Sequence, residues 1–365
     1  MKMIPHQSYS PQPPGDTIEE ILQRKGWSQR DFAVVLDRPV QAINEIIAGK
    51  KAITPETAMA FADALGNSAN YWLQLEGLYR LDLLRSKRNS GQESSVERRA
   101  RLFSKAPVSE LIKRRWIDAD LSDLDQTEKA VCDFLSIKSL DEDPDGFLAR
   151  KSASGEHTAA QIAWGCRARN IAKTMRSGRY SKDRLLTLIK ELPSWSQSDV
   201  DTKKVPGALA SVGVRLVFVE HLAGTRIDGG ATRLGEVPVI ALSLRYDRVD
   251  WFWFTLLHEL AHVIEHERSL DTQLVGNDAQ DGGSEMEERA NSQATEWLVP
   301  PEQLQSFVRS VKPYFSRSAI LNFAQRCRVH PGIIVGQLQK RGEIPYSHHR
   351  NLLIRIRHLF TESGG

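Results

Sequence analysis

The sequence predicts a mainly α-helical protein with one small α+β domain. Short amphipathic segments with helix caps fill its first quarter, and apolar residues at helical spacing recur through its middle. Strand-like apolar runs appear only in the second half, on either side of a glycine pair. With 365 residues, 41% of them hydrophobic, the chain is long enough for two or three domains with buried cores. The expected division is a disordered lead at 1–14, a five-helix domain at 15–82, a linker and helical middle region at 83–200, and an α+β domain with a helical cover at 201–365.

The composition favours a protein of the cytoplasm. The longest apolar run, Trp251 to Leu257, is far shorter than a membrane span, and the first residues contain no apolar segment typical of a secretion signal. Cys132, Cys166 and Cys327 lie far apart and form no C-x-x-C pair, so we expect free thiols in a reducing compartment. The net charge of +3 is too small to identify a nucleic-acid-binding protein by itself.

The five-helix domain is predicted from its caps and helix ends. Asp16 or Thr17 is expected to cap the first helix. Ser28 and Asp31 form the pattern of a capping box before the second helix, and Pro39 is expected as the first residue of the third. Five short helices with a tight turn between the second and third are the layout of a helix-turn-helix DNA reader.

In such a domain the third helix would lie in the major groove of DNA. Its outward residues, expected to face base edges, are Val40, Gln41 and Asn44, and Gln and Asn can each form two hydrogen bonds with adenine. The expected phosphate contacts are Gln29, Arg38, Lys50 and Lys51. The alternative is a helical protein-interaction module whose lysine pair is merely solvated.

These residues also resemble a known family. Ser28-Gln29, the run from Ile43 to Ala58 and Ala64-Leu65-Gly66 resemble the XRE/Cro-type helix-turn-helix domain of HigA antitoxins, over about residues 12–82. The resemblance implies double-stranded operator DNA as a partner and a role in toxin–antitoxin control. We expect the chain to act as a homodimer.

A metal site is predicted by the run from Thr255 to Ile264, which places His-Glu-x-x-His within an apolar segment. His258 and His262 are about one helical turn apart, so both can offer a ring nitrogen to one Zn²⁺. Glu259 is rotated away and suits a general base that acts on water. The alternative is an ordinary buried helix with two histidines and an ion-paired glutamate.

The third zinc ligand is expected on a helix that ends before Pro300. Glu287 is favoured, because Asn291 follows it by one turn and can hydrogen-bond a ligating histidine. Glu288 is the rival ligand, and Arg289 is expected to pair with it on the solvated face. An acidic helix start, favoured by the helix dipole, is the alternative for both glutamates.

This second half resembles the ImmA/IrrE family of metallopeptidases. The resemblance is carried by the strand and helix runs at 237–246 and 251–262, by Glu287-x-x-Ala290-Asn291 and by Leu298-Val299-Pro300. It implies a minimal zincin similar to thermolysin, of the gluzincin type, that uses Zn²⁺ to cleave DNA-binding repressors. Arg289 departs from the family, in which many members carry a second Glu before the Ala-Asn pair.

Several further features of the chain are open to two interpretations. Gly229-Gly230 is expected in a turn between two strands, and Leu242 to Arg245 as the strand edge that holds substrate. His221, Tyr246 and His266 either stabilise an oxyanion or have no catalytic role. The basic clusters 85–88 and 98–101 either extend the phosphate contacts or lie on solvated helix faces, and residues 266–284 are a candidate lid.

The predicted function is a DNA-binding transcriptional regulator that carries a zinc-dependent endopeptidase domain. Its expected substrate is a repressor or another regulatory protein, in stress, prophage or toxin–antitoxin control. The alternative is an antitoxin-type DNA-binding repressor whose zinc domain is not catalytic and serves as a sensor or as a scaffold that binds a toxin.

Overall fold

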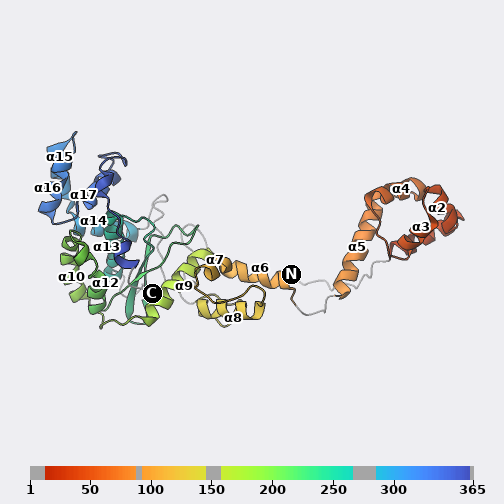
Figure 1. Ribbon diagram of the computed structural model, residues 1–365, viewed down its shortest axis with the longest axis horizontal. Coiled ribbons are helices and arrows are strands. Elements are labelled where there is room, and N and C mark those ends of the chain that lie inside the picture. The colour runs from red at the N-terminus through yellow and green to blue at the C-terminus, as the bar shows by residue number, and fades with distance from the viewer. Residues whose placement is uncertain (1–12, 88–92, 145–157, 266–284, 362–365) are drawn as a thin grey trace. The chain divides into compact units, whose positions relative to one another are not determined.

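The computed structural model describes residues 13–87, 93–144, 158–265 and 285–361. They belong to two compact units, residues 1–94 and 95–365 (Figure 1). The chain is mostly helical with one small sheet, so the predicted fold class is confirmed. None of the helices in the described ranges is both long and apolar enough to span a membrane.

The first unit contains five helices within its described residues. They are α1 (Pro14–Lys25), α2 (Gln29–Val35), α3 (Val40–Ile47), α4 (Pro55–Leu65) and α5 (Ala69–Lys87). Phe61 lies at the centre of their core, with its ring centroid 5.3 Å from that of Phe32 and 5.5 Å from that of Trp72. Ile18 and Ile43 are fully buried around these rings, so every one of the first five helices contributes to one core.

Helix starts in this unit agree only partly with the sequence prediction. Ser28 and Asp31 form the predicted capping box, because each side chain bonds the backbone N–H of the other. The predicted cap of the first helix is wrong: α1 begins at Pro14, and Asp16 lies in its first turn. Proline fixes φ near the helical value and lacks an N–H, so a helix can begin there without a side-chain cap. Pro39 likewise precedes α3 instead of opening it.

The second unit is built around a three-stranded sheet of β1 (Arg215–Phe218), β2 (Gly229–Leu234) and β3 (Val237–Leu242). Its order is β1-β3-β2, with β1 parallel and β2 antiparallel to β3. Gly229-Gly230 therefore opens a strand, and the prediction of a turn there is wrong. The turn lies at Gly235, whose φ of 62° suits glycine.

The position of β3 also corrects the predicted substrate edge. Because β3 lies between β1 and β2, both sides of Leu242 face paired strands, and residues 243–245 follow the strand. Among the described residues β2 pairs with β3 alone, so β2 is an edge strand of this sheet.

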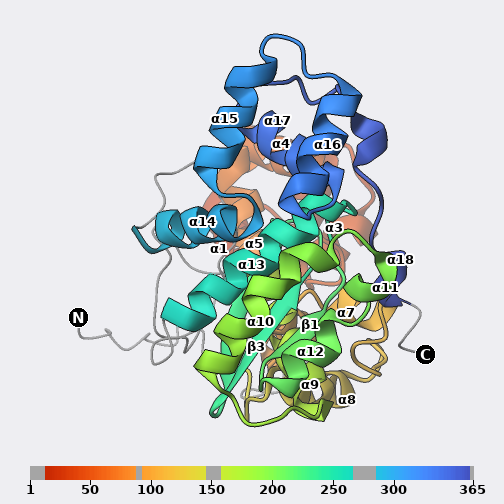
Figure 2. The same cartoon turned by 90° about the vertical axis from the view of Figure 1, so that its left-hand side faces the viewer.

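Helices cover both faces of the sheet (Figure 2). Val217, Val239 and Ala241 pack on one side against α6 (Ser95–Lys105), α7 (Val108–Lys113), α8 (Leu124–Leu135) and α9 (Ala159–Thr174). Leu216 and Ile240 point to the other side, as period-two alternation requires. That side carries α10 (Lys182–Trp195), α11 (Asp199–Thr202), α12 (Val205–Ser211), α13 (Val249–Glu265), α14 (Glu285–Leu298), α15 (Pro301–Val311), α16 (Arg317–Cys327), α17 (Pro331–Lys340), η1 (Arg350–Leu352) and α18 (His358–Thr361).

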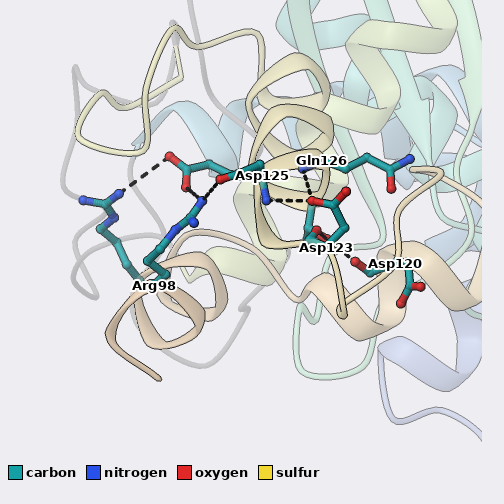
Figure 3. A network of polar contacts seen from close by, with 8 residues as sticks. Arg98, Asp120, Asp123, Asp125 and Gln126 are labelled. Carbon is teal, nitrogen blue, oxygen red and sulfur yellow. Dashed lines mark hydrogen bonds and ion pairs between the residues drawn. The ribbon is translucent and has the colours of Figure 1, made fainter. Parts of the chain in front are cut away.

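The basic cluster on α6 is occupied by ion pairs with α8. Arg98 lies 2.6 Å from Asp125 and 3.1 Å from Glu128, and Arg101 lies 3.6 Å from Glu128 (Figure 3). The Asp123 carboxylate caps α8 by accepting hydrogen bonds from the backbone N–H groups of Asp125 and Gln126. These arginines therefore join two helices of the second unit, and we assign them no phosphate contact.

We predict opposite stability effects for two helical Gly→Ala changes. A Cβ at Gly15 would lie 1.9 Å from the backbone oxygen of Ile47, whereas one at Gly77 meets no atom within 4 Å. Gly15→Ala should therefore destabilise the first unit by about 1–3 kcal/mol through overpacking. Gly77→Ala should stabilise it by up to about 1 kcal/mol through helix propensity. Thermal unfolding measures both, and equal shifts would contradict the close approach of α1 to α3.

Candidate functional site

The candidate metal centre is built on α13, a helix that is apolar on nearly all sides. Phe252, Trp253 and Leu256 are buried, as is every residue from Leu256 to Val263. The sheet, α14 and α17 enclose this helix. Its last turn is held by Lys182, whose Nζ donates a hydrogen bond to the carbonyl oxygen of Ile264 at 2.9 Å.

The structure brings together the three predicted metal ligands. The Nε2 atoms of His258 and His262 lie 3.1 Å apart on α13. Glu287, on α14, places Oε2 3.3 Å from His258 Nε2 and Oε1 3.2 Å from His262 Nε2. Both histidines are buried and Glu287 is partly buried, so the cluster is largely shielded from water.

The donor set fits a zinc ion. Tetrahedral coordination with bonds of about 2.1 Å separates neighbouring ligand atoms by about 3.3 Å, close to the distances in the cluster. The two ring nitrogens and a carboxylate oxygen of Glu287 lie within 4.8 Å of one another, so one metal ion could accept a lone pair from each of the three residues. Two neutral imidazoles and one carboxylate would complete three of the four positions of a catalytic zinc site.

The surroundings of Glu287 favour its ionised carboxylate. Burial by itself favours the protonated carboxyl, but hydrogen bonds from His258 and His262 outweigh it and lower the pKa of Glu287 to about 2. A carboxylate must be deprotonated to ligate a metal, so Glu287 is available as a ligand.

Glu259 lies in the opposite environment. It is completely buried, and among the described residues neither carboxylate oxygen has a hydrogen-bond partner. Burial, and then the negative charge of Glu287, raise the pKa of Glu259 well above its ordinary value. A carboxyl with a raised pKa binds a proton more strongly than an ordinary glutamate, which suits it to accept and return a proton.

Of the two glutamates considered as the third metal ligand, only Glu287 lies in the cluster. Glu288 is exposed and lies outside the cluster, and Arg289 pairs with Glu285, one turn earlier, instead of with Glu288. Asn291 is half-buried, and within the described ranges its side chain forms no hydrogen bond with either histidine. It lines an open groove of about 800 Å³ together with Glu265, Glu288 and Glu296, among others.

The candidate oxyanion residues do not join the cluster. His221 lies 3.4 Å from the hydroxyl of Thr225, and Tyr246 packs on Trp251 with ring centroids 4.4 Å apart. Neither hydrogen-bonds His258 or Glu259 in the part of the chain described here. His266 and the candidate lid at 266–284 lie outside the described residues.

The first unit presents most of the predicted DNA contacts on its surface. Gln41, Asn44, Lys50 and Lys51 are exposed, with the first two on α3 and the lysines just after it. Gln41 donates a hydrogen bond to Glu45 at 3.3 Å, which partly occupies its amide. Within α3, Asn44 is therefore the least constrained polar side chain among the predicted contacts.

Three predicted contacts are more constrained than the sequence indicates. Val40 is half-buried and packs against the core, so it presents less surface than an outward residue. Arg38 donates to the hydroxyl of Thr57 at 2.9 Å, and Gln29 donates to Glu19 at 3.2 Å. These bonds tie the side chain of Arg38 to α4 and that of Gln29 to α1.

Comparisons with known proteins match two separate segments of the chain. Residues 18–72 match the family model for the helix-turn-helix domain, and residues 215–336 match the model for the IrrE N-terminal-like domain. Over 81 residues the chain is 33% identical to an uncharacterized HTH-type transcriptional regulator, YddM, of Escherichia coli (strain K12), and the match covers 22% of this chain and 81% of that protein. The chain is a helix-turn-helix regulator with an IrrE-like domain.

Two solved structures are also similar to about a fifth of this regulator. One is a putative antidote protein of a plasmid maintenance system from Nostoc punctiforme, 35% identical with a TM-score of 0.20. The other is an addiction module antidote protein of a HigA family from Coxiella burnetii, 28% identical with a TM-score of 0.20. Each covers 21% of this chain and 85% of that chain.

The IrrE-like match begins at β1 and ends within α17, so it includes the His-Glu-x-x-His helix and α14. One residue beside this site was not foreseen from the sequence. Gly229 opens β2 directly against Glu259, with room for no Cβ between them. The glycine pair was the available signal, because glycine within a strand often marks a close approach.

Proposed function

We propose that this regulator binds operator DNA through its first unit and that its IrrE-like domain is a zinc-dependent endopeptidase. The observation that carries the proposal is the convergence of His258, His262 and Glu287 beside the buried carboxyl of Glu259. The expected substrate is a repressor or another regulatory protein, and the expected compartment is the cytoplasm.

In this proposal His258, His262 and Glu287 would hold the zinc ion. When bound, zinc would supply a Lewis acid that polarises a peptide carbonyl and makes water more acidic. Glu259 would take the proton from the attacking water and return it to the amine that leaves. Burial supports this role, because it raises the proton affinity of Glu259 and excludes bulk water from the helix.

The substrate strand is proposed to be β2. Ser243 N donates to Asp228 O at 2.9 Å, so alternate residues from Asp228 onward bond β3. Gly229, Ala231 and Arg233 then direct their N–H and C=O groups away from β3. An extended peptide that pairs with these groups would cross the sheet edge next to Glu259.

We also propose that the chain works as a homodimer through α5. Leu78, Leu81 and Leu84 are 55%, 51% and 62% exposed and follow one another at three-residue spacing along that helix. This spacing brings the three leucines near one face, and a second copy of the helix would bury them. Dimers of helix-turn-helix proteins read two half-sites, so two chains per operator are expected.

Metal content is the first prediction. The wild type should retain about one zinc per chain after reconstitution. Glu287→Ala should lose it, because the variant lacks the carboxylate between the histidines. Glu288→Ala is the matched control, since Glu288 is exposed and one residue away. Elemental analysis of the three proteins measures zinc per chain. A wild type that retains no zinc would contradict the proposal of a zinc-dependent endopeptidase.

Glu259→Gln separates catalysis from binding. The amide keeps the size of the side chain but cannot accept a proton, so cleavage should fall at least about 100-fold. Zinc content and operator affinity should stay at wild-type levels. A quenched fluorescent peptide library measures the cleavage. Equal residual activity in wild type and variant would instead favour a regulator whose metal domain senses or scaffolds without hydrolysis.

The two kinds of DNA contact should respond differently to substitution. Asn44→Ala should weaken operator binding by about 1–3 kcal/mol and relax sequence preference. Lys50→Ala should weaken binding to all sequences and reduce the salt slope by about one. Gln23→Ala on α1 is the control for an exposed polar side chain outside α3. Fluorescence anisotropy at several salt concentrations tests this, and two chains should bind each operator. Identical losses for Asn44 and Lys50 variants on all sequences would contradict the placement of α3.

A further inference from the structure

Gly229 is the point at which the sheet comes closest to Glu259. A Cβ at this position would lie 2.7 Å from Thr255 Cγ2, 2.9 Å from Glu259 Oε1 and 3.1 Å from Leu242 Cδ2. The first two distances are shorter than real Cβ contacts. Since φ of Gly229 is not positive, the glycine is required here for space and not for backbone freedom.

The neighbours of Gly229 form a closed slot. Thr255 lies one turn before Glu259 on α13, so both side chains point at the same part of the sheet. Leu242 is the partner of Gly229 on β3 and is 1% exposed. The hydroxyl of Thr255 and both oxygens of Glu259 are buried without a hydrogen-bond partner among the described residues.

Packing is therefore what fixes the Glu259 carboxyl. Hydrogen bonds usually orient a catalytic carboxylate, but within the described residues this one has none. A Cβ at position 229 would meet both Oε1 of Glu259 and the methyl group of Thr255, so the backbone of β2 borders the carboxyl. Any side chain at position 229 would push the carboxyl or the strand away.

We infer that Gly229 is a positioning residue for Glu259, acting by steric exclusion from the first position of β2. The inference rests on the proposed function only for its catalytic consequence. A displacement of about 1 Å at a catalytic group can cost on the order of 100-fold in rate. Gly229→Ala should thus lower kcat on a quenched fluorescent peptide library by about that factor, with zinc content unchanged.

A stability cycle tests the contact without any reference to activity. Thermal unfolding of the metal-free full-length chain is measured for Gly229→Ala, Glu259→Ala and the double variant. Gly229→Ala should lower Tm by about 3 °C or more in the wild-type background. The loss should be smaller when Glu259 is Ala, because Oε1 is then absent while the contact with Thr255 remains. Gly207→Ala is the control, since a Cβ there meets no atom within 4 Å.

The outcomes distinguish this inference from the proposed peptidase. Equal Tm losses in both backgrounds would overturn it, because independent residues have additive effects. Unchanged kcat in an active Gly229→Ala enzyme would overturn it as well. A wild type that cleaves no peptide while the Tm coupling persists would remove the peptidase but leave Gly229 as the residue that places Glu259.

Discussion

The burial of His258, Glu259 and His262 on one apolar helix is the constraint on which the IrrE-like domain depends. Burying a polar group costs free energy unless the group finds a hydrogen-bond partner. Glu287 supplies a partner for both histidines from a second helix, so α13 and α14 must lie together. Glu259 receives no such partner from the described residues, and only the tight approach of β2 defines its place. The centre is thus polar on the α14 side and sterically defined on the sheet side.

The small sheet that supports this helix is covered by helices on both of its faces. The parallel pair of β1 and β3 is stable only when both faces are covered. α13 covers one face with Leu256 and Leu260, while Val217 and Val239 require a second cover from α6 to α9. The described helices between residues 95 and 174 therefore complete the domain that carries the candidate metal centre. Ion pairs of Arg98 with α8 then join two of those covering helices.

Local chemistry could be predicted from the sequence, and contacts between distant segments could not. The capping box at Ser28 and the pairing of His258 with His262 depend on spacings of three or four residues, which the sequence contains directly. Glu287 could be predicted as a ligand for a similar reason, because Glu287 and Asn291 are four residues apart and share one face of a helix. The sequence predicts a turn at Gly229, whereas the structure requires glycine there because Glu259 lies against the strand. Glu259 is thirty residues later in the chain and in another layer, so this contact could not be predicted. Whether β3 is central or at the edge depends likewise on where β2 lies.

Environment, and not residue type, separates the roles of the two glutamates at this centre. Glu287 accepts hydrogen bonds from two histidines and has a pKa of about 2, so it remains an anion that can ligate a cation. Glu259 is buried beside that anion, and its pKa is raised by burial first and by Glu287 second. Two carboxyl groups whose proton affinities are driven apart can divide ligand and base chemistry between them. The two pKa shifts are coupled, because the negative charge of ionised Glu287 raises the pKa of Glu259. An exchange of the two environments would exchange the roles, although the sequence motif would be unchanged.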